Sequence, residues 1–222
     1  LFFEYYWALP NQMIYTPHAV DNLRFQNEMT SVLPQKNNIK YVLGIQPISK
    51  IVLWSAKFIS KKRPYDMIEA FQNLSLPNVV LIMLGDGILY EEIKRYVVEN
   101  NLTSILLPGF INQSEIAKYY GIADIFVMTS GKGETWGLAI NEALNFNIPI
   151  IISDVCGCSE DLLKDGINGY VYPVGNIQQL TSSINKVLTA SIDDSNLKHK
   201  NNEILKEFSY ATISENISAN LR

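Results

Sequence analysis

Residues 125 to 142 have the sequence IFVMTSGKGETWGLAINE, which changes character twice within a short distance. The uninterrupted apolar run Ile125 to Met128 predicts a strand, and the glycine-rich residues after it predict a loop. Gly137 marks the expected start of a helix that carries Glu142. A strand, a loop and a helix in this order form the kind of junction at which open α/β sheets bind ligands.

The same alternation of apolar runs and amphipathic segments continues on both sides of this junction. Apolar runs without polar alternation are typical of strands that helices cover on both faces, so they predict a central parallel sheet. The expected strands are residues 51–56, 79–84, 104–107, 125–128 and 149–152. The expected helices are residues 64–73, 89–99, 113–120, 137–146, 159–164 and 177–188. The pattern predicts an α/β fold, a doubly wound parallel (Rossmann-like) sheet flanked by helices.

The two ends of the chain fit this pattern less well. Residues 1–50 contain several prolines and predict a connecting segment with one short helix around residues 36–43. We expect the α/β domain to extend from residue 17 to residue 190. Residues 191–222 predict a polar helical tail with its apolar residues on one face, which should pack on the domain.

The composition narrows the class of protein. A chain of 222 residues with 47% hydrophobic residues can bury a packed core. A formal net charge of −4 argues against non-specific binding to nucleic acid, which needs a broad basic surface. Cys156 and Cys158 are too close for a stabilising disulfide and too few for a zinc site, so we expect a reduced cytoplasmic protein without a metal.

Two lysines follow the first expected strand. Lys57 comes directly after it, and Lys62 lies just before Pro64, a residue that suits the first turn of a helix. Both ammonium groups are therefore expected at the carboxyl edge of the sheet, where a helix N-terminus adds positive charge and the pair could bind a diphosphate. A solvated charge run is the alternative that composition alone leaves open.

Gly85 and Gly87 follow the second expected strand and predict a tight turn before the next helix. They match the beginning of a dinucleotide-binding fingerprint, but Tyr90 stands where that fingerprint has its third glycine. We therefore expect no nicotinamide or flavin cofactor.

Glu134 and Glu142 are separated by seven residues, a spacing that by itself favours a solvated pair. Gly137 leaves the backbone amides around Leu138 open to an anion. Glu142 lies about one turn inside the helix and cannot share the place of that anion, so paired ribose hydroxyls suit it. Glu134, in the loop, can reach a separate group such as a sugar hydroxyl.

A cysteine nucleophile is not expected from this sequence. Cys156 or Cys158 would need a partnering base. The two histidines, His18 and His199, both lie in peripheral segments. We therefore expect packed loop thiols and a structural His18.

Taken in order, the motifs resemble the C-terminal, nucleotide-sugar-binding half of retaining glycosyltransferases of family 4, which have the GT-B fold of two facing α/β domains. The resemblance covers about residues 14 to 190. It rests on the segments Pro17-His18-Ala19-Val20-Asp21, Lys57 with Lys62, Gly85-Asp86-Gly87, Pro108-Gly109-Phe110, Glu134 with Glu142, and Asp165-Gly166-Ile167-Asn168-Gly169.

The resemblance implies a role for each matching residue. Lys57 and Lys62 would bind the donor diphosphate and stabilise the leaving group, and Glu134 would contact the transferred sugar, so these three are the implied catalytic residues. Glu142 would hold the ribose. The implied donor-binding set is Lys57, Lys62, Gly85, Phe110, Ile111, Glu134, Gly137, Leu138 and Glu142, with Phe110 or Ile111 meeting the base through backbone groups. Transfer in such enzymes needs no metal.

The chain departs from the family pattern in places. Lys57 stands where the family usually has Arg, which keeps the charge but loses the bidentate fork. Thr135 replaces a glycine of the family motif. The acceptor-binding half is absent, so residues 1–16 are expected to be a boundary segment from it, and the chain alone should bind donor yet transfer poorly.

The implied activity is retaining transfer of a sugar from a nucleoside-diphosphate sugar to a saccharide or lipid-linked acceptor, as in polysaccharide or lipopolysaccharide biosynthesis. The full-length protein would be cytoplasmic, with peripheral association at the inner face of the membrane. Two alternatives stay open: a nucleotide-sugar epimerase or hydrolase on the same fold, and a non-catalytic nucleotide-binding module.

Overall fold

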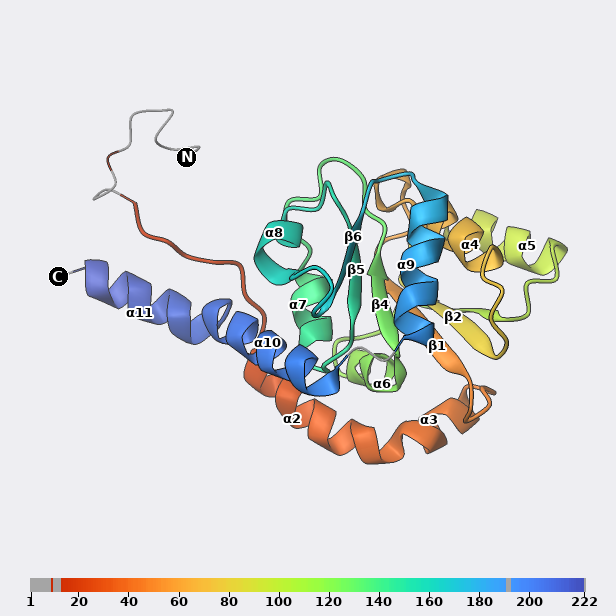
Figure 1. The fold of residues 1–222 in the computed structure, drawn as a ribbon, viewed down its shortest axis with the longest axis horizontal. Helices are drawn as coiled ribbons and strands as arrows, with labels where there is room; N and C mark the ends of the chain where they lie inside the picture. The colour runs from red at the N-terminus through yellow and green to blue at the C-terminus, as the bar shows by residue number, and fades with distance from the viewer. Residues whose placement is uncertain (1–8, 10–12, 191–192, 222) are drawn as a thin grey trace.

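The computed structural model describes residues 9, 13–190 and 193–221, which form a parallel sheet with helices on both faces (Figure 1). The six strands pair in the order β3-β2-β1-β4-β5-β6, and every neighbouring pair is parallel. Their bounds are β1 (Lys50–Ser55), β2 (Val79–Leu84), β3 (Ile105–Gly109), β4 (Ile125–Met128), β5 (Ile150–Ser153) and β6 (Gly169–Tyr172). The predicted doubly wound α/β fold is confirmed. Most of the expected boundary segment 1–16 lies outside the described residues.

Each face of the sheet has its own hydrophobic core, because successive side chains of a strand point to opposite faces. In β1, Ile51 and Leu53 join one core, whereas Val52 and Trp54 join the other. The first core is covered by α2 (Asn22–Val32), α3 (Lys36–Val42), α6 (Ile116–Ile122), α7 (Leu138–Leu144), α8 (Cys158–Leu162) and α10 (Asp194–Glu207). The second is covered by α4 (Pro64–Gln72), α5 (Tyr90–Glu99) and α9 (Ile177–Thr189).

The strand order reverses between β1 and β4, which lie side by side at the centre of the sheet. The chain leaves β1 toward β2 and β3 on one side, and it leaves β4 toward β5 and β6 on the other. Connections that diverge in this way open a crevice at the carboxyl ends of the two strands. The loops that carry Lys57 and Glu134 both begin at this reversal point.

The structure contains a helix that the sequence analysis missed. Helix α2 begins after Asp21, whose carboxylate accepts a hydrogen bond from the Arg24 amide at 3.0 Å and caps the helix. It packs closely on α6 at Gly121. A Cβ added to this glycine would lie only 2.3 Å from Val32 Cγ1, so only a glycine leaves room for the α2 side chain. Its apolar positions, such as Phe25, are sparse among polar residues, so the periodic pattern was too weak to predict it.

Strand β6 was also missed. It is an edge strand of four residues that begins at a glycine, and only its first and last residues are buried. Four residues of this kind do not form a recognisable apolar run, so the sequence pattern does not separate the strand from the turn before it.

The C-terminal tail folds as two helices. Helix α10 adds Ile204 and Leu205 to the first core, and Phe208 follows it there. The side-chain amide of Asn22 donates to the carbonyls of Leu205 and Phe208, at 3.0 Å each, and so fastens α10 to α2. Helix α11 (Tyr210–Asn220) has no buried residue and projects beyond the sheet (Figure 1).

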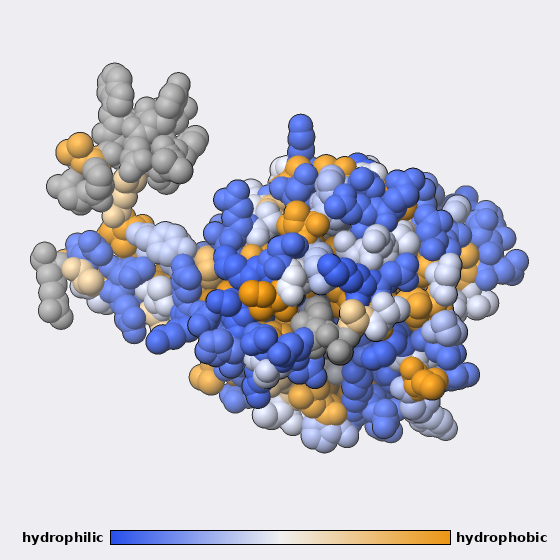
Figure 2. Space-filling model, viewed as in Figure 1, coloured by the Kyte–Doolittle hydropathy of each residue, from blue (hydrophilic) through white to orange (hydrophobic). Residues whose placement is uncertain are grey.

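The visible surface is mostly hydrophilic, and its hydrophobic side chains form separate groups among polar ones (Figure 2). None of the helices in the described part of the chain is both long and apolar enough to cross a membrane.

Candidate functional site

A pocket of about 480 Å³ opens at the carboxyl edge of the sheet, beside the ends of β1 and β2. Five of the residues predicted to bind the donor line it: Lys57, Gly85, Phe110, Ile111 and Glu142. The remaining lining residues are Ser55, Ala56, Leu84, Asp86, Gly87, Gln113 and Ile116. The structure therefore brings together residues that are widely separated in the sequence, at the place that the topology favours.

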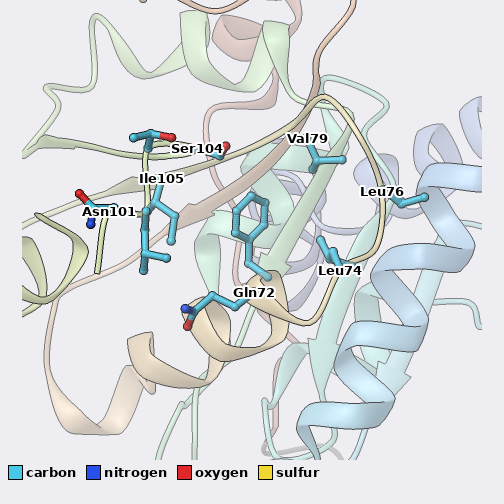
Figure 3. A pocket seen from close by; sticks show the side chains of 10 residues that line it. Gln72, Leu74, Leu76, Val79, Asn101, Ser104 and Ile105 are labelled. Atoms are coloured by element: carbon cyan, nitrogen blue, oxygen red, sulfur yellow. The ribbon is translucent and has the colours of Figure 1, made fainter. Parts of the chain in front are cut away.

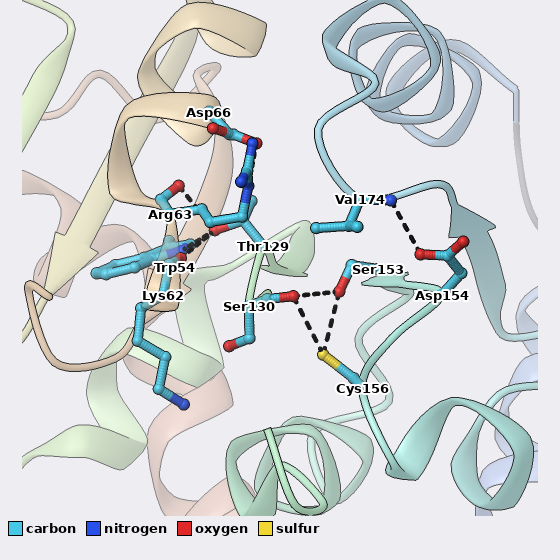
Figure 4. Close-up of polar contacts among 10 residues, drawn as sticks. All are labelled: Trp54, Lys62, Arg63, Asp66, Thr129, Ser130, Ser153, Asp154, Cys156 and Val174. Atoms are coloured by element: carbon cyan, nitrogen blue, oxygen red, sulfur yellow. Dashed lines mark hydrogen bonds and ion pairs between the residues drawn. The ribbon is translucent and has the colours of Figure 1, made fainter. Parts of the chain in front are cut away.

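The second predicted lysine lies in a connection that is held firmly to the loop after β4. Thr129, directly after β4, accepts a hydrogen bond from Trp54 Nε1 at 2.9 Å and donates to the carbonyl of Lys62 at 2.7 Å (Figure 4). The Gly131 amide donates to the carbonyl of Lys61 at 2.7 Å, and the Lys61 ammonium donates to the carbonyl of Gly133 at 2.8 Å. These bonds fix the position of Lys62 relative to the loop that carries Glu134.

Lys62 and Glu134 form an ion pair in this structure. Their side chains are 16% and 10% exposed, so the pair is largely shielded from water. The sequence analysis placed both groups at the same edge of the sheet but gave each a separate ligand. Their direct contact was not predicted.

Glu142 projects from α7, which begins directly after Gly137. Gly137 has a φ of 112° and lies so close to its neighbours that an added Cβ would be 2.9 Å from Met128 Sδ, so a glycine suits this position. Leu138, the first residue of the helix, is 48% exposed.

The Glu142 carboxylate has partners on several elements. The Tyr120 hydroxyl of α6 donates to it at 2.8 Å, and the side chain of Gln113 also donates to it. Burial raises the pKa of Glu142, whereas these two hydrogen bonds and the charge of Arg24 act in the opposite direction. Arg24, on α2, donates to the Gln113 side-chain oxygen at 2.7 Å and to its carbonyl at 3.1 Å.

Sequence reasoning missed several members of this site. The sequence analysis placed Gln113 and Tyr120 only as the first and last residues of an expected helix, and Arg24 in a segment without predicted structure. Thr129 and Ser130 follow a strand at the same edge as Lys57, which is a signal that could have found them. The Ser130 hydroxyl is buried and has no hydrogen-bond partner among the described residues, and it points away from Ser153 and Cys156 (Figure 4).

The two cysteines are buried near this edge, as expected for packed thiols. Cys158 starts α8, and Cys156 shares a hydrogen bond with Ser153 at 3.2 Å. Burial raises the pKa of both thiols. The charge of Lys62 acts in the opposite direction at Cys156, but burial outweighs it, so neither thiol is an activated cysteine.

Both thiols are expected to resist alkylation while the protein is folded. The thiolate is the reactive form, and burial disfavours it and blocks access at the same time. The measurement is the rate of labelling by iodoacetamide at about pH 8, a pH near the pKa of a free thiol. Labelling should become fast only in concentrated guanidinium chloride. Fast labelling of the native chain would show that one thiol is accessible and activated.

A second pocket, of about 360 Å³, lies at the opposite edge of the sheet near the start of β2 and β3 (Figure 3). Its described lining contains apolar, amide and hydroxyl side chains such as Leu74, Leu76, Asn101 and Ser104, and no charged side chain. A diphosphate is bound by cationic side chains or clustered amides. The pocket that Lys57 lines is therefore the better candidate for a diphosphate site.

Comparison with known proteins identifies the family and the fold. A family model described as "Glycosyl transferases group 1" matches residues 35–204. An uncharacterised glycosyltransferase, MJ1178 of Methanocaldococcus jannaschii, is 26% identical over 94% of this chain. The chain spans 58% of the length of that relative.

Two solved structures have a similar fold. The C-terminal domain of a group 1 glycosyl transferase, LpcC of Francisella tularensis, matches with a TM-score of 0.68 and 20% identity, over 85% of this chain and 97% of that domain. Anabaena Alr3699/HepE, solved with UDP-glucose, matches with a TM-score of 0.78 and 21% identity, over 94% of this chain and 56% of that one. The fold is thus that of the C-terminal domain of a GT-B glycosyltransferase. Together with the family match, it shows that the chain belongs to the group 1 glycosyl transferases, as the resemblance to family 4 implied.

Proposed function

We propose that this chain is the donor-binding domain of a retaining glycosyltransferase that transfers a sugar from a nucleoside-diphosphate sugar to a saccharide or lipid-linked acceptor. The observation that carries the proposal is the pocket at the reversal point of the sheet, in which Lys57 and Glu142 line one cavity. A cationic group and a carboxylate in one pocket suit a ligand with a phosphate at one end and vicinal hydroxyls at the other.

Each predicted residue has a proposed role. Lys57 and Lys62 bind the diphosphate, helped by backbone amides at Gly137 and Leu138, and Glu142 accepts hydrogen bonds from the ribose. Phe110 or Ile111 meets the base through backbone groups, and Gly85 allows the donor to approach the loop after β2. UDP is the first nucleotide to test, because the similar Anabaena protein was solved with UDP-glucose.

The Lys62–Glu134 ion pair suggests how the donor would be received. A diphosphate takes the place of the Glu134 carboxylate at Lys62, and the released carboxylate contacts a hydroxyl of the transferred sugar. As the bond between the anomeric carbon and the phosphate oxygen breaks, its electron pair stays with the nucleoside diphosphate. The anomeric carbon forms a bond to the acceptor hydroxyl oxygen, and the proton of that hydroxyl passes to the departing diphosphate. The two ammonium groups stabilise that charge, and Glu134 acts by positioning and electrostatics.

The test is a calorimetric titration of the chain with UDP, GDP, ADP and the corresponding sugar nucleotides. We expect UDP to bind, and Lys57→Ala to weaken it by about 10- to 100-fold, since hydrogen bonds to charged groups contribute about 1.5–3 kcal/mol. Lys198→Ala is the control, because Lys198 is an exposed lysine on α10 outside the pocket lining. Absence of binding by every nucleotide would overturn the proposal.

The chemical reaction is tested with the full-length protein. Transfer of labelled sugar that Glu134→Ala abolishes supports the glycosyltransferase. Release of free sugar, or conversion of the nucleotide sugar without an acceptor, would instead identify a hydrolase or an epimerase. Nucleotide binding without any turnover would identify a binding module.

A further inference from the structure

Three residues from separate parts of the fold support the Glu142 carboxylate. The family match gives none of these three residues a role. Tyr120, on α6, is fully buried, and its hydroxyl donates to Glu142 Oε2 at 2.8 Å. Gln113, in the connection between β3 and α6, lines the same pocket as Glu142. Arg24, on α2, donates a hydrogen bond to the side chain of Gln113.

The hydrogen bonds of Gln113 have a fixed direction. The Arg24 guanidinium donates to the side-chain oxygen of Gln113 at 2.7 Å and to its backbone carbonyl at 3.1 Å. With its oxygen occupied by Arg24, the Gln113 side chain presents its amide nitrogen to the Glu142 carboxylate. The Arg24 guanidinium also lies 3.5 Å from the carboxylate of Glu28, one turn further along α2, which helps to orient it.

These contacts decide which form of Glu142 is populated. Burial favours the neutral acid, because a carboxylate loses solvation when it leaves water. The titratable and charged groups that act on Glu142 are Tyr120 of α6 and Arg24 of α2, and Gln113 adds a neutral donor. All three favour the carboxylate, the form that can accept hydrogen bonds from two ribose hydroxyls at once.

We propose that Tyr120 and Gln113 are positioning residues that keep Glu142 ionised and directed into the pocket, and that Arg24 orients Gln113 for this purpose. The role rests on the proposed function, in which Glu142 binds the ribose of the donor. It extends the donor site from the pocket lining to α2 and α6. The identity of the base and of the sugar does not enter into it.

The test is the pH dependence of UDP affinity, measured by calorimetry between about pH 4.5 and pH 8, a range that brackets a raised carboxyl pKa. Affinity should fall on the acid side as Glu142 takes up its proton. In Tyr120→Phe and in Gln113→Ala the carboxylate loses a donor, its pKa rises, and the acid limb should move to higher pH by about one unit. Arg24→Met should move it in the same direction by less. The terminal phosphate of UDP also titrates in this range, with a pKa of about 6, and contributes the same acid limb in every variant. In Glu142→Gln only that contribution should remain.

The matched control is Tyr65→Phe. The Tyr65 hydroxyl also donates to a glutamate, Glu92, at 2.6 Å, but this pair joins α4 to α5 outside the pocket lining. Its removal should leave the pH dependence of UDP affinity unchanged. A shift as large as that of Tyr120→Phe would mean that loss of any such bond disturbs the site through the fold.

A second measurement does not depend on the nucleotide. The ¹³C chemical shift of the Glu142 carboxyl carbon gives its pKa directly in the free protein and in each variant. Unshifted titration in both Tyr120→Phe and Gln113→Ala would overturn the inference. A shifted titration in a chain that binds no nucleotide would overturn the proposed function and leave the support of Glu142 established.

Discussion

Lys62→Met is expected to lower the free energy of unfolding by about 2–3 kcal/mol and to weaken UDP binding at least about tenfold. The Lys62 and Glu134 side chains are only 16% and 10% exposed. Removal of the ammonium therefore leaves the Glu134 carboxylate shielded from water and without its cation. Breaking a fully buried pair costs about 3–5 kcal/mol, and the residual exposure of this one reduces the cost. The measurements are urea denaturation and UDP calorimetry.

The double variant Lys62→Met/Glu134→Gln separates the two effects. It removes the stranded charge, so it should regain most of the lost stability, but it lacks the cation and should not regain UDP affinity. Lys118→Met is the control for loss of an ion pair as such. Lys118 and Glu115 are 49% and 53% exposed, and that change should cost less than about 0.5 kcal/mol. Unchanged stability of Lys62→Met would show that the pair contributes nothing in solution.

The central strands and the position of the site could be predicted because each depends on local sequence. β1, β2 and β4 are runs of large apolar residues, and their carboxyl ends lead directly to Lys57, Gly85 and the Glu134 loop. Parallel strands place their carboxyl ends at one edge, so the residues that follow them meet there whatever the packing. This is why five predicted donor residues line one pocket.

The contacts between side chains could not be predicted in the same way. Lys62 and Glu134 are 72 residues apart, and Tyr120 and Glu142 are 22 apart. Such pairs depend on the distance between loops and on the rotation of helices, which an apolar pattern does not specify. Arg24 was invisible for a further reason, because the helix that carries it has too few apolar residues to be recognised. The sequence thus brought five candidate residues to one pocket, whereas the contacts that support them required the folded structure.

Gly157→Ala is expected to destabilise the fold by about 2–3 kcal/mol and to displace the Glu134 loop. Gly157 precedes α8 with an ordinary helical φ of −59°, so its backbone conformation does not require glycine. The space around it does. An added Cβ would lie 2.1 Å from the Thr135 carbonyl oxygen and 3.5 Å from the Trp136 Cα, and backbone atoms cannot rotate out of the way.

Two backbone hydrogen bonds hold the loop before α8 against the loop that carries Glu134. The Gly157 amide donates to the carbonyl of Glu134 at 3.4 Å, and the Cys158 amide donates to that of Trp136 at 3.0 Å. To admit a methyl group the loops must separate, which stretches both bonds and moves the residue that pairs with Lys62. A Gly→Ala change also makes the unfolded chain less flexible, which favours folding by about 0.4–1 kcal/mol, so the clash outweighs that gain.

The control for this change is Gly166→Ala. Gly166 has a φ of +74°, and an added Cβ would meet nothing within 4 Å, so alanine there suffers backbone strain of about 1 kcal/mol without any collision. Gly166→Ala should therefore lose some stability and keep UDP affinity, whereas Gly157→Ala should lose both. The close approach of the Gly157 backbone to the Thr135 backbone sets the position of Glu134. Equal UDP affinity in Gly157→Ala and Gly166→Ala would therefore contradict an effect of Gly157 on the donor site.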